Sequence, residues 1–181
     1  MVKFNFVAFL IFELLTLPSI SQSRWKAVTY SVTFTIKHVA GVTAKGKFTG
    51  LKADILFDPK NTGSAIINAT LEASTFQTGN NLRDKTVKGK EYLDVISYPL
   101  ISMRSIKVMH KEGDNYEGVF RLTIKSVTKD IPIKFSFTRS EKQGVFKSEF
   151  TVNRLDYGIG SKSFMLSNEA VITILVNTVK E

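Results

Sequence analysis

Strict alternation of apolar and polar residues is the feature that most constrains how this chain can fold. Apolar side chains occupy every second position at Tyr30, Val32, Phe34 and Ile36, with polar residues between them. A period of two places successive side chains on opposite faces of a β-strand, so that one face is buried and the other meets solvent. The same alternation returns along most of the chain. The sequence therefore predicts an all-β fold.

Eight strands of this kind are expected. They begin near Tyr30, Leu51, Ala65, Leu100, Tyr116, Ile131, Val145 and Glu169. The connections at 111–115 and 140–144 are short and polar, as hairpin loops between antiparallel strands usually are. Eight antiparallel strands with short turns indicate an up-and-down barrel or a two-sheet sandwich. An eight-stranded barrel is either filled by its own side chains or holds one small ligand.

Residues 75–99 interrupt this pattern. They show no alternation, and a charged stretch follows Gly79. The segment predicts a short helical connection between the third and fourth strands, with Asn80 or Asn81 as its N-cap. A long connection of this kind is either a lid over a site or a loop that closes the end of the barrel.

The N-terminus has the arrangement of a secretory signal peptide. Lys3 precedes an apolar run from Phe4 to Leu17, and Pro18 and small residues follow up to Ser23. We expect cleavage after Ser23, which divides the chain into a signal peptide, 1–23, and one domain, 24–181. The run is too short for a stable membrane anchor. The alternative is an amphipathic helix that docks on the domain.

Few residues suggest chemistry. The chain has no cysteine, and its two histidines, His38 and His110, have no partners at metal-ligand spacing. No serine lies in a nucleophile motif. Gly158 and Gly160 resemble the start of a phosphate-binding loop, but no helix pattern follows them, so they are weak evidence for such a loop. The formal net charge of +9 favours anionic partners, but the basic residues are scattered, which disfavours nucleic acid. We expect a protein without cofactor or metal that is not an enzyme.

Five motifs appear in order along residues 24–181. They are S-x-x-F-x-x-x-H at 31–38 with a G-x-F-x-G turn at 46–50, T-G and R-D at 78–84, Y-L-D-V, Y-P and I-S-M-R-S at 92–105, L-T-I-K-S-V-T-K at 122–129, and R-L-D-Y-G at 154–158. Together they resemble the signature of the YceI family. Tyr92 and Met103 stand where that family usually has phenylalanine, and Ser126 replaces a usual hairpin glycine.

The resemblance implies a lipocalin-like barrel, exported to the bacterial periplasm, whose pore holds a long-chain isoprenoid of polyprenyl or isoprenoid-quinone type. Apolar residues at alternating strand positions are the expected pore lining: Phe34, Ile36, Phe48, Phe120, Leu122, Ile133 and Phe135. Burying a long alkyl chain there contributes roughly 0.8 kcal/mol per CH₂ group.

Polar residues near the long connection are candidates for the mouth of the pore. They are Arg83, Asp84 and Lys85 on the connection, and Arg154, Asp156 and Tyr157 near the end of the chain. These residues either bind a lipid head group or form ion pairs, such as Arg83 with Asp156 or Arg154 with Asp84, that brace the connection. We expect bracing.

Two other functions remain open. The barrel could carry fatty acyl or amide lipids. If large side chains fill it, the protein would instead be a structural or stress protein of the envelope that docks on anionic lipid or polymer. A homodimer is also possible.

Overall fold

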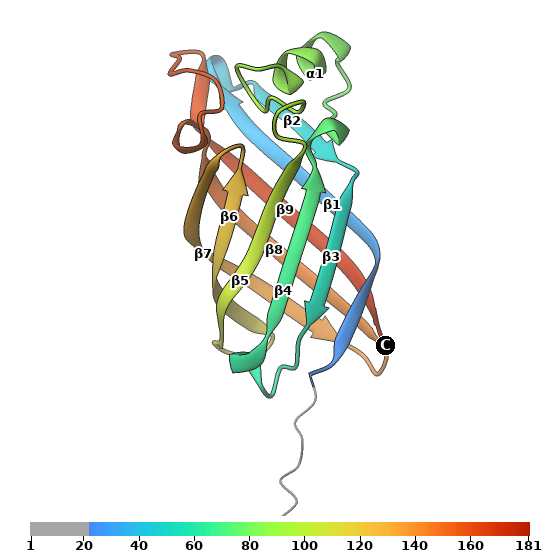
Figure 1. Ribbon diagram of the computed structural model, residues 1–181. Helices are drawn as coiled ribbons and strands as arrows, with labels where there is room; N and C mark the ends of the chain where they lie inside the picture. Colours follow the sequence, from blue (N-terminus) through green and yellow to red (C-terminus); the bar gives the residue numbers. More distant parts are fainter. Residues whose placement is uncertain (1–21) are drawn as a thin grey trace, which may run out of the picture.

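The computed structural model describes residues 22–181 (Figure 1). The expected signal peptide therefore lies outside the described residues, apart from Gln22 and Ser23. Those two residues contact the loop after the third strand: Gln22 Nε2 donates to the Asn61 carbonyl at 2.7 Å, and the Ser23 carbonyl accepts from the Phe57 N–H at 2.9 Å.

Residues 22–181 form nine strands and one α-helix. The strands are β1 Arg24–His38, β2 Thr43–Phe48, β3 Leu51–Leu56, β4 Ile66–Glu72, β5 Leu100–His110, β6 Asn115–Ile124, β7 Val127–Arg139, β8 Gln143–Asn153 and β9 Leu166–Lys180, and the helix is α1 Asn81–Lys88. Neighbours along the chain pair antiparallel from β3 to β9. β1 pairs with β9 from Trp25 to His38, which closes the sheet into a barrel. Closure excludes the sandwich and confirms the barrel.

Two of the nine strands share one position around the barrel. β2 pairs with the second half of β1, whereas β3 pairs with β1 only at Arg24 and Trp25. The Tyr30 hydroxyl spans the break between β2 and β3, because it donates to the Thr49 carbonyl and accepts from the Leu51 N–H. The barrel is thus eight-stranded in circumference, as predicted.

The expected turn at 46–50 is wrong in its extent. Gly46, Lys47 and Phe48 belong to β2, and the chain reverses earlier, at Val39–Gly41. A glycine in mid-strand and a lysine on either side of it hid this short strand from the alternation pattern. Gly46 is required by packing, since a Cβ there would lie 2.3 Å from the Phe34 ring opposite it.

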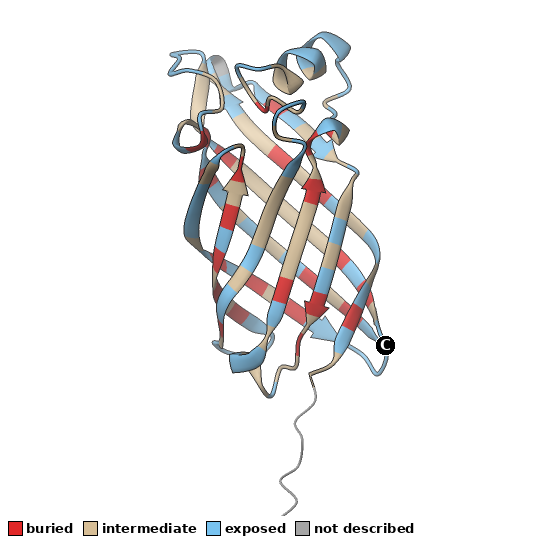
Figure 2. Cartoon of the chain, in the orientation of Figure 1, coloured by how far each residue is buried: buried red, intermediate tan, exposed pale blue. Residues whose placement is uncertain are grey.

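Burial follows the alternation that the sequence shows. Along β6, Tyr116, Gly118, Phe120, Leu122 and Ile124 are all buried, and the residues between them are more exposed. Figure 2 shows this alternation on the strands around the barrel. Along β6, the residues predicted to face inward are therefore the buried ones.

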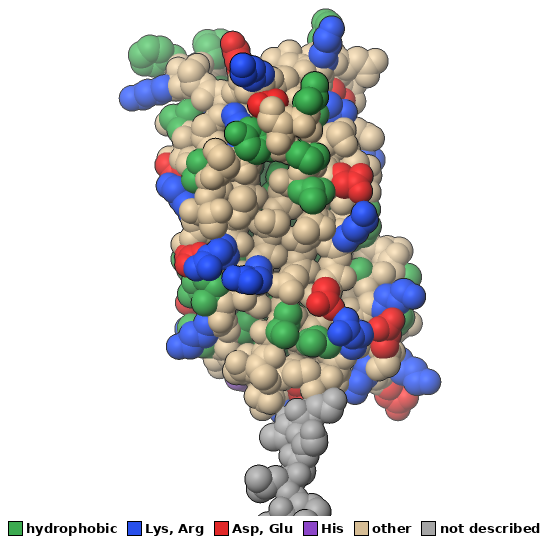
Figure 3. Space-filling view, in the orientation of Figure 1, with side chains coloured by type: hydrophobic (Ala, Val, Ile, Leu, Met, Phe, Trp, Pro, Cys, Tyr) green, Lys and Arg blue, Asp and Glu red, His purple; other side chains and the backbone are tan. Residues whose placement is uncertain are grey.

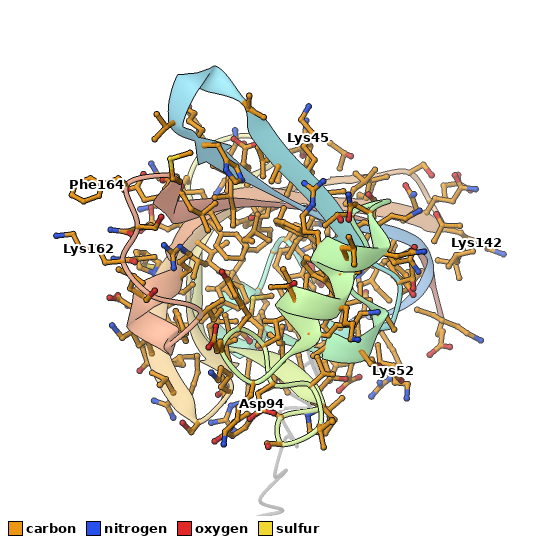
Figure 4. The ribbon with its side chains drawn as sticks, turned by 90° about the horizontal axis from the view of Figure 1, so that it is seen from above. Lys45, Lys52, Asp94, Lys142, Lys162 and Phe164 are labelled. Carbon is orange, nitrogen blue, oxygen red and sulfur yellow. The ribbon has the colours of Figure 1, made fainter. Side chains whose placement is uncertain are left out.

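The connections divide between the two ends of the barrel. Segments 39–42, 73–99, 125–126 and 154–165 lie at one end, where α1 covers the barrel (Figures 1 and 4). Asn80 caps α1 by accepting from the Arg83 N–H at 3.0 Å, as expected. The two-residue turn between β6 and β7 has Lys125, not Ser126, at positive φ, and Lys125 Nζ donates to the Gly158 carbonyl at 2.9 Å. Segments 57–65, 111–114 and 140–142 lie at the other end.

Candidate binding cavity

A cavity of about 420 Å³ occupies the half of the barrel below α1. It is within the size range of small-molecule sites in proteins, about 300–1,000 Å³. Its walls are mostly the inward-facing aliphatic and aromatic side chains of the strands. Thr78, Arg83 and Thr86 from the long connection also line it, so the cavity reaches the end of the barrel that α1 covers. We call this end the mouth.

The structure divides the seven predicted pore residues between two regions. Phe34, Ile36, Phe48 and Leu122 line the large cavity. Phe120, Ile133 and Phe135 lie deeper and line a separate void of about 70 Å³. The predicted residues all face the interior, but only four of them could touch a ligand in the large cavity.

The half of the barrel away from the mouth is filled by aromatic side chains. The Phe57 ring meets the rings of Tyr116, Phe137 and Phe146 edge-on, with centroids 5.1 to 5.6 Å apart. Trp25 packs on Phe137 at 5.0 Å, and its indole N–H donates to the Phe57 carbonyl at 2.9 Å. Edge-to-face pairs at these distances are favourable beyond the area they bury. This aromatic cluster closes the barrel from below.

Met103 and Phe150 mark the boundary between the two regions, because both line the large cavity and the small void. Neither residue was predicted to line the pore. Met103 alternates with Ile101 along β5, so the alternation pattern could have indicated that Met103 faces inward. Phe76, which stacks on Phe34 with centroids 4.9 Å apart, lies in the irregular connection, where no periodicity could have indicated it.

Arg154 is the buried cation of the site. Its side chain lines the cavity, and the residue is 3% exposed. The guanidinium donates to the carbonyls of Ser167, Ile159 and Ser161 at 2.8 to 3.0 Å. Buried charges need such partners. These bonds fold segment 154–165 around the arginine, with Gly160 at φ +65° close against it.

The predicted ion pairs of the mouth are wrong. Asp84 accepts from the backbone N–H and the hydroxyl of Thr78, at 2.8 and 2.6 Å, and not from Arg154. Asp156 pairs with Lys129 at 2.7 Å, and not with Arg83. The physical reason is the same in both cases: a residue nearby in space already satisfies each carboxylate. Asp84 nevertheless braces the connection, because Thr78 and α1 are held together by it.

Arg83 lies at the mouth without an ion-pair partner in the described part of the chain. Among residues 22–181, no acidic side chain lies within ion-pair distance of its guanidinium, although it lines the cavity. In the described part of the chain, Arg83 therefore has no acidic side chain with which it could brace the connection. Lys85, the third candidate on the connection, is exposed and does not line the cavity.

Tyr157 packs beside the cavity but does not line it. It is buried among apolar residues that include Leu122, Ile124 and Val152. Burial, together with the neighbouring Asp156 carboxylate, raises the pKa of its hydroxyl above the usual value. Tyr157 is therefore neutral at physiological pH and belongs to the wall that supports the cavity.

The cavity lining carries two arginines and no acidic residue. His38 also lines it, whereas His110 lies at the other end and contacts the Gly113 carbonyl at 2.8 Å. Across residues 22–181, no three His, Asp or Glu side chains gather in a way that could hold a metal ion. The site is thus suited to an apolar ligand whose polar end is neutral or negatively charged.

None of the helices in the described range is long and apolar enough to cross a membrane.

A closed eight-stranded antiparallel barrel with an apolar cavity at the end that α1 covers is a lipocalin-like barrel. Residues 25–178 match the YceI-like domain, so the chain belongs to the YceI-like family. This confirms the family resemblance seen in the motifs. The fold is a binding-protein fold.

Relatives of known sequence are described as UPF0312 proteins. One from Yersinia pestis (strain Pestoides F) is 28% identical over 124 residues, which cover 67% of this chain and 64% of the relative. One from Pectobacterium atrosepticum is 26% identical over 156 residues, covering 83% of this chain and 81% of the relative. The chain therefore spans less than two thirds of the length of the Yersinia protein.

Solved structures share the fold. BcnA of Burkholderia cenocepacia superposes with a TM-score of 0.78 at 20% identity, over 82% of this chain and 95% of that one. A YCEI protein of Campylobacter jejuni gives 0.73 at 21% identity, over 80% and 90%. A polyisoprenoid binding domain from Saccharophagus degradans gives 0.71 at 11% identity, over 89% and 99%.

Proposed function

We propose that this protein is an exported carrier that holds an isoprenoid chain in the cavity below α1. The observation that carries the proposal is the cavity itself, about 420 Å³ lined mostly by apolar side chains, inside a barrel that the pairing of β1 with β9 closes. The family match supports a binding protein, and the fold is shared with a polyisoprenoid binding domain. Export is proposed from the signal-peptide arrangement of residues 1–23, with the periplasm as destination.

The cavity sets how much of a chain can be buried. On β9 its lining runs from Leu166 to Ile174. Eight residues at about 3.3 Å each, on a strand tilted by about 40°, correspond to a depth of about 20 Å. An extended hydrocarbon advances about 1.3 Å per carbon, given C–C bonds of about 1.5 Å. About sixteen main-chain carbons, or four isoprene units, therefore fit before the aromatic cluster stops the chain.

This depth makes the ligand preference testable. We expect affinity to rise from farnesol to geranylgeraniol and to change little from there to octaprenol, whose remaining units would extend through the mouth. Stearyl alcohol is the straight-chain control, and equal or tighter binding of it would favour a fatty acyl carrier. Absence of binding by every alcohol would refute the carrier function, whereas a continued rise to octaprenol would refute only the depth.

The filled-barrel alternative applies to half of the molecule. The aromatic cluster around Phe57 fills the lower half, as that alternative required of the whole barrel. The upper half is open because its inward positions carry small side chains, such as Ala44, Ala69 and Ala170, among the aromatic ones. A structural role without a ligand would leave this apolar volume unexplained.

A further inference from the structure

Large apolar side chains that face solvent gather at the mouth of the barrel. Among residues 22–181, ten such side chains are exposed, and seven lie in or beside the mouth connections: Val39, Val42, Leu82, Ile96, Leu100, Phe164 and Met165. Phe164, Ile96 and Leu82 are 99%, 93% and 80% exposed, whereas Val28, the most exposed of the three elsewhere, is 59% exposed. Exposure of this degree and concentration marks an interaction surface.

These side chains come from three connections that surround the entrance to the cavity. Val39 and Met165 join two of them directly, because the Val39 N–H donates to the Met165 carbonyl at 3.1 Å. Each connection also supplies a neighbouring residue to the cavity wall: His38 precedes Val39, Arg83 follows Leu82, and Leu166 follows Met165. We call the seven side chains the apolar rim.

Basic side chains accompany the apolar rim. Apart from the buried Arg154, the mouth connections 39–42, 73–99, 125–126 and 154–165 carry six basic residues and four acidic ones. The connections 57–65, 111–114 and 140–142 at the other end carry three basic and four acidic residues. In the view onto the mouth, Lys162 and Phe164 both project away from the barrel on the same side (Figure 4). Apolar and basic groups also lie side by side along the upper edge in Figure 3.

A bilayer suits this surface better than a protein partner does. The rim residues lie on separate protruding connections and not on one flat patch, and lipid can rearrange around protrusions. Apolar side chains that enter the boundary between head groups and acyl chains bury their area there. Lysines beside them are attracted to an anionic surface, while their alkyl stems remain among apolar groups.

Such an orientation would place the cavity entrance at the acyl boundary. The cover over that entrance is lightly held, because no residue of α1 is buried. We propose that the mouth end of this protein docks on the surface of an anionic lipid bilayer through the apolar rim. An apolar ligand would then pass between cavity and bilayer without crossing water.

The test is co-sedimentation of the domain 24–181 with vesicles of phosphatidylcholine containing about one third phosphatidylglycerol. We expect binding to these vesicles, and at least tenfold weaker binding for the variant Leu82→Ser, Ile96→Ser, Phe164→Ser. The matched control, Val28→Ser with Ile106→Ser, removes exposed apolar side chains far from the mouth and should bind as the wild type does. All five positions are exposed, and the thermal midpoint of each variant should confirm folding.

Three results would overturn the proposal: no binding of the wild type, equal binding of the rim variant, or equal loss in the control. The proposal would also be overturned if the wild-type protein does not bind vesicles and light scattering shows a dimer that the rim variant does not form. Lipid content of the same preparations, measured by mass spectrometry, reports on the carrier function separately. A rim variant that keeps its bound lipid but loses vesicle binding separates the two.

Discussion

Replacing Leu122 by tryptophan tests whether the upper half of the barrel is a ligand site. Leu122 lines the large cavity, on β6 beside Met103 of β5. Added bulk has room there, so we expect the fold to survive with a thermal midpoint close to that of the wild type. If the larger side chain displaces about three CH₂ groups of ligand, at roughly 0.8 kcal/mol each, about 2.4 kcal/mol of binding is lost. This corresponds to about fifty-fold weaker binding.

Ile133→Trp is the matched control in the lower half. Ile133 is buried beside a void of only about 70 Å³, among packed aromatic rings. Overpacking of a filled core costs about 1–3 kcal/mol. For a domain of this size the thermal midpoint should fall by roughly 3–10 °C. Ligand affinity of the folded variant should stay within a few-fold of the wild type.

The assay is equilibrium binding of geranylgeraniol to each variant, alongside thermal unfolding followed by circular dichroism. The two substitutions should give opposite results: Leu122→Trp loses ligand and keeps stability, and Ile133→Trp keeps ligand and loses stability. If Leu122→Trp destabilises the protein as much as Ile133→Trp does and leaves binding unchanged, the upper half is packed and the reasoning fails.

Further predictions concern Arg83, Tyr157 and the N-terminus. Arg83→Ala should weaken geranylgeranyl phosphate roughly fivefold more than geranylgeraniol, since an exposed charge contributes at most about 1 kcal/mol; Lys85→Ala, which lies off the cavity, is the control, and equal losses for both ligands would contradict a head-group contact. Tyr157→Phe should leave stability at neutral pH unchanged or raised by up to about 1 kcal/mol, because the buried hydroxyl has no hydrogen-bond partner among residues 22–181. Because the pKa of Tyr157 is raised in the folded state, its contribution to stability is constant below about pH 10 and is lost above it, where the unfolded state deprotonates first. Above pH 10 the stability of the wild type should therefore fall faster than that of Tyr157→Phe, and parallel pH profiles would refute this. N-terminal sequencing of the periplasmic fraction should begin at or near Arg24, and an intact Met1 would remove the proposal of export.

Alternation in the sequence predicted the strands and the inward faces because side-chain direction in a strand depends only on the neighbouring residues. Phe34 and Phe120 therefore look alike in the sequence, although one lines the cavity and the other belongs to the aromatic core. What separates them is their height along the barrel, which depends on register between strands. Alternation within one strand contains no information about that register.

The mouth was harder to predict for a different reason. Arg154, Asp84 and Asp156 were predicted to form ion pairs at the mouth, but each of them bonds to a partner other than the predicted one. Asp84 and Arg154 bond largely to backbone groups and to Thr78, and any residue can offer a backbone carbonyl. Opposite charges in the sequence therefore suggested ion pairs. In the structure, the tight turns of segment 154–165 place backbone carbonyls closer to the Arg154 guanidinium than any carboxylate of the described residues.

The central claim is that the cavity below α1 holds an isoprenoid. It is tested most directly by purifying the protein from its own cells without detergent, extracting it with organic solvent, and identifying the extract by mass spectrometry. We predict one isoprenoid species in near-stoichiometric amount, and its loss from Leu122→Trp but not from Ile133→Trp. Extracts of the wild type that contain no lipid, or only straight-chain acyl species, would contradict the claim.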